Sequence, residues 1–402
     1  MTSRVLGLVR DQVLASLFGA GDAMDAYNVA FRIPNLVRDL FAEGAMSAAL
    51  VPTFTRVRTE RGPDAAWRLG SNAINALLIA TGLIVVGAFV GARPFVDRLA
   101  TGFASVPGKV ELTVLLTRIM LPFLMLVAVA AALMGMLNSL HVFFVPALSP
   151  ATFNVAAILC ALFLVTPVTQ LGWPPVVAIA IGTLVGGCAQ VAIQWPALRR
   201  QGYRYEPYLD WHDSGLRRML TLMGPGTLGM AATQVNVFVN TVLATTAGTG
   251  AVSWLNYAFR LMYLPTGLFG VSIATATLPT TARHAARGDT AAVRRTVANG
   301  LGLMFMLNVP ATIGLIVLAS PIVRLIFERH AFLPGDTLAT AAALQFYAVG
   351  LLGYSTVRIA SPTFYALGDS ITPVRASVIT VAINVLLNLV LVRTMGFRGL
   401  AL

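Results

Sequence analysis

Long apolar runs separated by short polar segments recur along the whole chain. A membrane-spanning helix needs about 20 predominantly apolar residues, at a rise of about 1.5 Å per residue. By this measure the pattern predicts eleven spans, and a twelfth begins near Phe397 and stops at Leu402. The predicted spans are 1–18, 25–54, 70–92, 112–138, 146–166, 174–198, 217–245, 252–282, 296–319, 337–364 and 372–393. We therefore predict an all-α, polytopic membrane protein.

Composition agrees with this fold class and excludes an ordinary soluble domain. Of the 402 residues, 57% are hydrophobic and 11% are charged, whereas soluble domains average about 25% charged residues. The net charge of +12 is sparse and is interrupted by apolar runs. Loops that face anionic lipid explain such a charge better than nucleic-acid binding does, so no nucleic-acid partner is expected.

Basic residues in the loops predict the orientation in the membrane. Arginines concentrate in the predicted loops 55–69, 199–216 and 283–295, which lie on one side of the membrane. With Arg375, that side carries fourteen basic residues against seven on the other side, where Lys109 is the only lysine of the chain. Cytoplasmic loops are enriched in basic residues, so the N-terminus is predicted to be cytoplasmic.

An internal repeat divides the chain into two halves. The matching segments are 26–32 with 254–260, 51–53 with 278–280, and 82–86 with 314–318. Their offsets are 228, 227 and 232 residues, so they follow one another in the same order at nearly one spacing. Six spans in each half give both halves the same orientation, which is the parallel repeat found in some transporters. We predict two parallel six-helix lobes, residues 1–200 and 201–402, around a central cavity.

Five arginines inside the predicted spans are candidate substrate ligands. Helix rise places Arg10, Arg32 and Arg260 about 12–14 Å from the outer turns, near the middle of a core about 30 Å thick. Arg4 and Arg38 lie about 22–24 Å from the outer side by the same measure. A basic residue at a helix centre costs about 2.5–3.5 kcal/mol in lipid, so these side chains are expected to face a water-filled cavity. Guanidinium groups match phosphate oxygens, which predicts a multiply anionic substrate.

The alternative is that each arginine neutralises a neighbouring acid. The acids in reach are Asp11, Asp25, Asp39 and Glu43. Arg32 shares a helical face with three of them at about 100° per residue, although Pro34 interrupts that helix. Both alternatives stay open at this stage.

Other candidate sites are weaker. Asn384 and Asn388 share a face of one span and with Asn240 form either a helix–helix hydrogen-bonded patch or a weak cation site, since sodium prefers a carboxylate ligand. Catalytic motifs and a metal-binding cluster are absent from the sequence, and the two cysteines have no CxxC spacing. We therefore expect no cofactor, no metal and no enzymatic activity.

Several motifs resemble one known family. They are RVLGLVRD at 4–11, FGAG at 18–21, PNL at 34–36, FAEGA at 41–45, RLM at 260–262, LIFER at 325–329 and YALGD at 365–369. In these motifs, and over nearly its whole length, the chain resembles the MurJ (MviN) family. The members of this family are lipid II flippases of the multidrug/oligosaccharidyl-lipid/polysaccharide exporter superfamily.

The resemblance implies a fourteen-helix protein of the bacterial cytoplasmic membrane, whose last two helices lie beyond Leu402. It implies a cavity that alternates between inward-open and outward-open states and moves lipid II, an undecaprenyl-pyrophosphate-linked disaccharide-pentapeptide. Membrane lipids and cell-wall synthesis proteins are further candidate partners. By this resemblance, positions matching Arg4, Arg10, Asp11 and Arg260 engage the pyrophosphate, and positions matching Asp25, Arg38 and Glu43 have charge or gating roles. Combined with the depth argument, the candidate substrate-binding residues are Arg4, Arg10, Asp11, Arg38 and Arg260, and the candidate gating or structural charges are Asp25, Arg32 and Glu43.

The chain departs from the family pattern at four places. Asp39 replaces a second basic residue, Phe259 stands where an acid often precedes Arg260, and His330 replaces a glycine. Amides also stand where some members carry carboxylates for sodium, which weakens the expectation of sodium coupling. The alternative functions are export of another anionic lipid-linked oligosaccharide and a non-transporting membrane scaffold for cell-wall synthesis.

Overall fold

A computed structural model describes residues 2–40, 46–369 and 371–402, and within these ranges every regular element is a helix. The elements are α1 (Thr2–Phe18), α2 (Asp22–Leu40), α3 (Met46–Arg61), α4 (Pro63–Val90), α5 (Ala92–Leu99), η2 (Thr101–Ser105), α6 (Lys109–Met120), α7 (Phe123–Ser139), α8 (Phe144–Gln170), α9 (Val177–Arg200), α10 (Ser214–Thr246), α11 (Ala251–Pro265), η3 (Thr266–Gly270), α12 (Val271–Ala286), α13 (Thr290–Val317), α14 (Ala319–Phe327), α15 (Pro334–Ala366), α16 (Ile371–Met395) and α17 (Phe397–Ala401). The predicted all-α fold class is confirmed.

Eight helical segments of the described chain are long and apolar enough to cross a membrane. They include α4, α8, α9, α13, α15 and α16, together with the continuous segments Lys109–Ser139 and Ala251–Ala286. One expectation from the sequence was wrong in detail, because the loop predicted at 55–69 is helical on both sides of Gly62. The span predicted at 25–54 contains α2 and the start of α3, and its residues 41–45 lie outside the described residues. Pro63 can follow Gly62 directly, because the first helical position needs no backbone N–H.

Proline and polar caps explain several helix boundaries. Pro122 separates α6 from α7, because a proline lacks the N–H that would continue the helix. Pro265 ends α11 and is followed by the π-helical turn η3. Asp289 caps α13, since its carboxylate accepts a hydrogen bond from the Ala292 amide at 2.8 Å.

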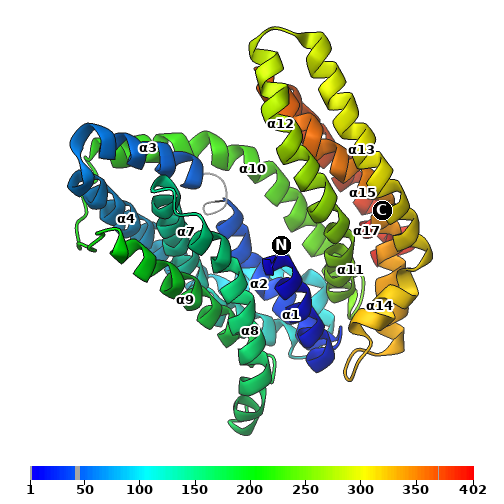
Figure 1. Cartoon of the computed structure of the whole chain (residues 1–402). Coiled ribbons are helices and arrows are strands. Elements are labelled where there is room, and N and C mark those ends of the chain that lie inside the picture. The colour runs from blue at the N-terminus through cyan, green and yellow to red at the C-terminus, as the bar shows by residue number, and fades with distance from the viewer. Residues whose placement is uncertain (1, 41–45, 370) are drawn as a thin grey trace. The chain divides into compact units, whose positions relative to one another are not determined.

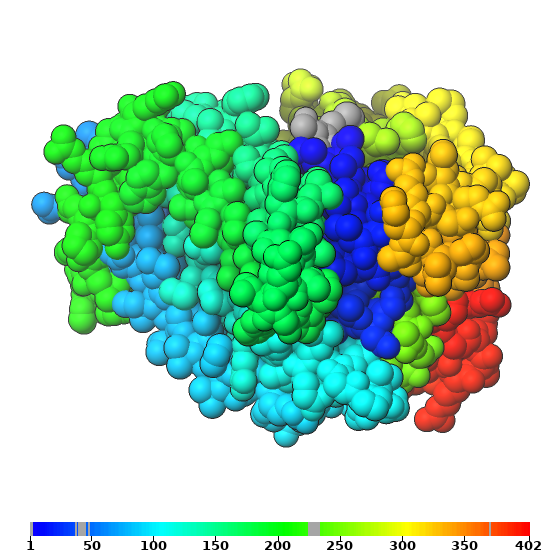
Figure 2. Space-filling model, turned by 90° about the horizontal axis from the view of Figure 1, so that it is seen from below, coloured from blue at the N-terminus to red at the C-terminus, as the bar shows by residue number. Residues whose placement is uncertain are grey.

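Contacts between Cα atoms group the described residues into two compact units. The N-terminal unit contains residues 2–14 and 22–238. The α7, α8 and α9 helices pack side by side in it (Figure 1). One core of this unit joins α3, α4 and α7 through buried side chains such as Leu50, Phe54, Ile74 and Met136. Figure 2 shows the segment from α5 to α6, light blue to cyan, on the surface of this unit.

The C-terminal unit contains residues 15–21 and 239–402. Its α12, α13 and α15 helices run side by side (Figure 1), around a core of Ile273, Met304 and Ile359. The turn at Gly19 is fixed within this unit, because the Tyr257 hydroxyl donates to the Gly19 carbonyl at 3.2 Å. Gly19 has φ +65°, and a Cβ there would lie 2.4 Å from the Ala331 carbonyl oxygen, so a larger residue does not fit.

The predicted repeat appears as the same order of helices in both halves. The matching segments lie on α2 and α11, on α3 and α12, and on α4 and α13. A short helix follows in each half, α5 after α4 and α14 after α13. The contact division falls in α10, between Phe238 and Val239. The lobe boundary at residues 200–201 stays a prediction.

Candidate functional site

Arg10 is paired with its neighbour Asp11 on α1. Its Nε and Nη2 atoms donate to Asp11 Oδ1 at 3.0 and 2.7 Å, and the two side chains are 14% and 11% exposed. The guanidinium also lies 5.9 Å from the Phe153 ring centroid. For Arg10 the structure therefore contains the ion pair that the alternative reading anticipated. A carboxylate that binds two atoms of one guanidinium also fixes the direction of its remaining N–H groups.

Asp25 belongs to a buried ion-pair cluster that the sequence analysis missed. Lys109 Nζ lies 3.0 Å from Asp25 Oδ2 and 2.7 Å from Asp22 Oδ1. The Asp25 and Lys109 side chains are 0% and 2% exposed, and the ammonium stacks 4.1 Å from the Phe103 ring centroid. The expectation that Lys109 is a loop charge was wrong, because the residue begins α6 and its side chain is buried against α2.

The other predicted residues of the N-terminal unit lie on α1 and α2. Arg4 is exposed near the start of α1, and Arg32 and Arg38 are half-buried on α2. Glu43, predicted as a gating charge, lies outside the described residues, as does the side chain of Asp39. The structure brings the Asp25 carboxylate to Lys109, a partner that the sequence analysis did not consider.

Arg260 lies on α11 of the C-terminal unit with its side chain exposed. Phe259, which stands where the resemblance expects an acid, precedes it in the sequence and is also exposed. Arg10 belongs to the N-terminal unit. The joint binding site that the sequence predicts from Arg10 and Arg260 therefore stays a prediction.

The three candidate amides do meet. Asn388 Nδ2 donates to Asn240 Oδ1 at 2.5 Å and to Asn384 Oδ1 at 2.8 Å, which links α16 to α10. Asn388 is buried. Among the described residues there is no group of three His, Cys, Asp or Glu side chains placed to hold a metal ion. The geometry is that of a helix–helix hydrogen-bonded patch.

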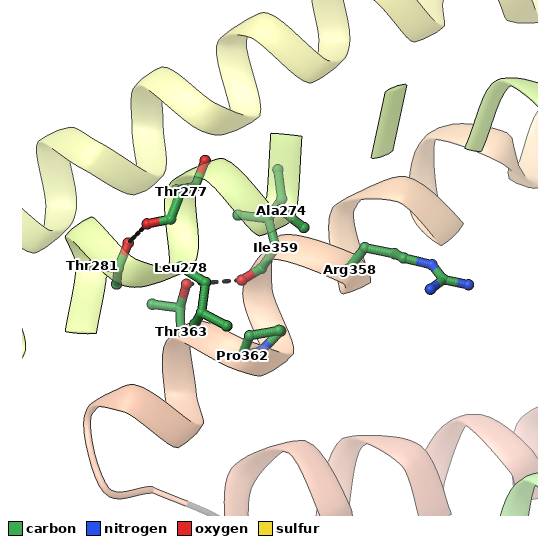
Figure 3. Close-up of a pocket in the computed structure, with 8 residues that line it drawn as sticks. All are labelled: Ala274, Thr277, Leu278, Thr281, Arg358, Ile359, Pro362 and Thr363. Carbon is green, nitrogen blue, oxygen red and sulfur yellow. Dashed lines mark hydrogen bonds between the residues drawn. The ribbon is translucent and has the colours of Figure 1, made fainter. Parts of the chain in front are cut away.

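Two hollows formed by described residues lie in the C-terminal unit. Figure 3 shows the first, a cavity of about 10 Å³ between α12 and α15, with room for about one water molecule. Its threonines donate to their own helices, for example Thr281 Oγ1 to the Thr277 carbonyl at 3.0 Å and Thr363 Oγ1 to the Ile359 carbonyl at 2.8 Å. Arg358 extends away from these threonines (Figure 3) and donates to the Tyr263 hydroxyl.

The second hollow is an open groove of about 520 Å³ between α14 and the start of α15. Arg324, Leu325 and Leu338 contribute to its lining. Beside it, Glu328 accepts hydrogen bonds from Thr337 Oγ1 at 2.7 Å and Arg324 Nε at 3.3 Å. The Thr337 hydroxyl, helped by Arg324, lowers the pKa of the Glu328 carboxyl below its usual range, so this group stays charged beside the groove.

Comparisons with known proteins agree with the resemblance. A sequence profile for the family described as "Lipid II flippase MurJ" matches residues 14–402. The chain is 36% identical to a "Probable lipid II flippase MurJ" of Vibrio cholerae, over 100% of the chain and 77% of that protein. It is 35% identical to a "Lipid II flippase MurJ" of Burkholderia cenocepacia, over 100% of the chain and 78% of that protein.

Solved structures show the same fold. The structure titled "Lipid II flippase MurJ, inward closed conformation" matches with a TM-score of 0.84 and 28% identity, over 99% of the chain and 81% of that protein. An inward-facing multidrug transporter of the MATE family matches with a TM-score of 0.81 and 17% identity, over 99% of the chain and 89% of that protein. An outward-facing structure from the same transporter family matches with a TM-score of 0.63 and 17% identity, over 100% of the chain and 87% of that protein.

Proposed function

Because the chain belongs to the MurJ family of lipid II flippases, we propose that it moves lipid II across the bacterial cytoplasmic membrane. The observation that carries the proposal is the family match, which extends over residues 14–402 and over more than three quarters of relatives at 35–36% identity. The eight apolar spans supply the membrane-embedded scaffold that such transport requires. The N-terminus is proposed to be cytoplasmic, in line with the basic residues near Arg56, Arg199 and Arg283.

The proposed cycle is alternating access. Transporters with the same fold are solved in inward-facing and outward-facing states, and a MurJ protein is solved in an inward-closed state. In this cycle the prenyl tail of the substrate stays in lipid while the charged head crosses inside the protein. Proline-interrupted helices such as α2 and α13 offer places at which a span can bend.

The proposed diphosphate ligands are Arg10 and Arg260, with Arg4 and Arg38 along the path. Their support is chemical: a guanidinium stays charged when partly desolvated and matches phosphate oxygens with paired N–H donors. Asp11 would act as a positioning residue, because its contacts to Nε and Nη2 of Arg10 hold the guanidinium in one orientation. Asp25 would contribute through structure, since its carboxylate is held by Lys109.

Complementation tests the function and the ligands together. Cells depleted of their own lipid II flippase would express the wild-type chain, Arg10→Glu, Arg260→Glu, or the control Arg295→Glu, an exposed arginine on α13. We expect growth with the wild-type chain and the control, and lysis with the other two variants at equal membrane abundance. Normal growth with both Arg10→Glu and Arg260→Glu would contradict the assignment of these arginines as diphosphate ligands.

Transport itself is measured with purified protein in proteoliposomes that contain lipid II. Lipid II translocation by the wild-type chain supports the flippase. Growth without translocation would instead favour the membrane scaffold, and translocation of a different lipid-linked oligosaccharide in its place would favour the alternative exporter.

A further inference from the structure

Four aromatic side chains gather around Phe259, the residue that precedes Arg260 on α11 of the C-terminal unit. They come from α11 and α15, which pack against each other. We call Phe259, Tyr263, Tyr347 and Tyr354 the aromatic platform. On α11, Phe259 and Tyr263 are four residues apart and therefore share a helical face, and Tyr347 and Tyr354 on α15 are seven apart and also share one.

Phe259 is the centre of the platform. Its ring stacks on Tyr263 at a centroid distance of 5.7 Å with an interplanar angle of 26°. The rings of Tyr347 and Tyr354 meet it edge to face, at 5.7 and 6.2 Å. These are the separations and orientations that aromatic pairs prefer, so the four rings form a preorganised surface rather than four independent side chains.

Arg358 places a positive charge at the edge of the platform, next to Tyr263. Its guanidinium carbon lies 5.4 Å from the Tyr263 centroid, and one of its N–H groups donates to the Tyr263 hydroxyl. Figure 3 shows this side chain extending away from α12. The platform therefore has polar groups at its rim and apolar ring surface at its centre.

Two rings of the platform are exposed, and the other two, Tyr263 and Tyr347, are half-buried. Phe259 is 36% exposed and Tyr354 is 49% exposed, and Arg260 is exposed on the next position of α11. All of these residues lie within helices long and apolar enough to span a membrane. An exposed arginine in a span is costly against lipid and is tolerated beside a water-filled space. Arg260 therefore favours a water-filled space next to this part of α11.

We propose that the aromatic platform binds a sugar ring of the transported substrate and so contributes to substrate specificity. The inference rests on the proposed function, in which a diphosphate is held at Arg260. In a polyprenyl-diphosphate sugar the first pyranose is bonded directly to the diphosphate, so a diphosphate at Arg260 brings that ring to the neighbouring Phe259. One face of a pyranose is lined by C–H bonds, which carry partial positive charge and pack on the negative face of an aromatic ring.

The rim of the platform suits the rest of the sugar. Tyr hydroxyls donate and accept hydrogen bonds and Arg358 donates them, which matches the hydroxyl groups around a pyranose. Phe259 has no acidic group and so adds no negative charge beside the diphosphate.

Binding of two ligands to the full chain in lipid nanodiscs tests the proposal. The ligands are lipid II, which carries sugars, and undecaprenyl pyrophosphate, which carries the same diphosphate and prenyl chain without them. Phe259→Leu keeps apolar bulk and removes the ring, and Phe259→Tyr restores a ring as the matched control. We expect Phe259→Leu to weaken lipid II binding by about three- to ten-fold. Undecaprenyl pyrophosphate binding should stay within two-fold, and Phe259→Tyr should recover lipid II binding.

Each other outcome overturns the proposal. If Phe259→Leu weakens the binding of both ligands equally, Phe259 has a structural role only. If it weakens the binding of neither ligand, the platform does not bind the sugar. Equal affinity of the wild-type chain for both ligands would show that no sugar is bound. Arg260→Gln separates the proposed function from the platform, since it should weaken both ligands equally. If the wild-type chain binds neither ligand, the proposed function fails and the platform assignment fails with it.

Discussion

The ammonium of Lys109 lies 3.0 Å from the carboxylate of Asp25, and both side chains are shielded from solvent. The pair joins the start of α6 to α2, the helix that also carries Arg32 and Arg38. Asp22 shares the same ammonium at 2.7 Å. A buried charge needs its partner, because an uncompensated charge in a low-dielectric site costs several kcal/mol.

Lys109→Met is therefore expected to destabilise the protein by about 3–5 kcal/mol, since it removes the buried ammonium that compensates the charge of the buried Asp25 carboxylate. Thermal unfolding in detergent micelles measures the loss. The matched control is Asp22→Asn, whose side chain is 45% exposed and whose contribution should be below about 1 kcal/mol. Lys109→Met with Asp25→Leu should recover much of the stability. A double variant no more stable than Lys109→Met would contradict this account.

Asn388→Leu is expected to destabilise the C-terminal unit by about 1 kcal/mol, because it removes both hydrogen bonds that Asn388 donates within the amide patch. Thermal unfolding measures the change, and Leu386→Ala, a substitution at an exposed position of α16, is the control. The amide patch also predicts that replacing sodium by potassium leaves the Tm unchanged. A sodium-specific rise in Tm that disappears in Asn388→Leu would instead identify a cation site.

His330 has φ +48°, a backbone conformation that glycine adopts at little cost. Its Nδ1 atom also lies 2.9 Å from Ser16 Oγ. His330→Gly and His330→Ala both lose this contact, so the difference between their free energies of unfolding reports the cost of the positive φ. We expect His330→Gly to be more stable than His330→Ala by about 1 kcal/mol in chemical or thermal unfolding. Equal stability of the two variants would show that the residue relaxes to negative φ without cost.

The charge of Glu328, beside the groove between α14 and α15, should make the stability of the protein depend on pH. Its pKa is lowered in the folded state, first by the Thr337 hydroxyl and then by Arg324. A group with a lowered folded pKa adds stability above its unfolded pKa of about 4.3, and this stability is lost as the pH falls through the folded pKa. Thr337→Val should therefore unfold more easily than the wild-type chain at neutral pH.

The difference between Thr337→Val and the wild-type chain should shrink as the pH is lowered below about 4. Unfolding midpoints measured from pH 7 to pH 3 follow it, and Thr337→Ser, which keeps the hydroxyl, is the control. A difference that is constant over this range would assign the effect to packing rather than to the charge of Glu328.

The sequence by itself determined the helices, because a membrane-spanning helix requires a continuous run of apolar residues and such a run is visible locally in the sequence. The start of α8 at Phe144, of α16 at Ile371 and of the short α17 at Phe397 all lie within a few residues of the predicted positions. The repeat was readable for the same reason, since matching segments keep their order along the chain. The joint placement of Arg10 and Arg260 is still a prediction, because it depends on how distant helices come together.

Tertiary structure alone decided the partners of the charges and rings. Lys109 and Asp25 are 84 residues apart, and Phe259 and Tyr354 come from different helices. A hydropathy pattern places each residue on a helix and at a depth, but many polar groups in other helices share that depth. Which of them lies within hydrogen-bond distance is set by packing, because a buried charge or ring is stabilised only by the neighbour that the folded chain brings to it.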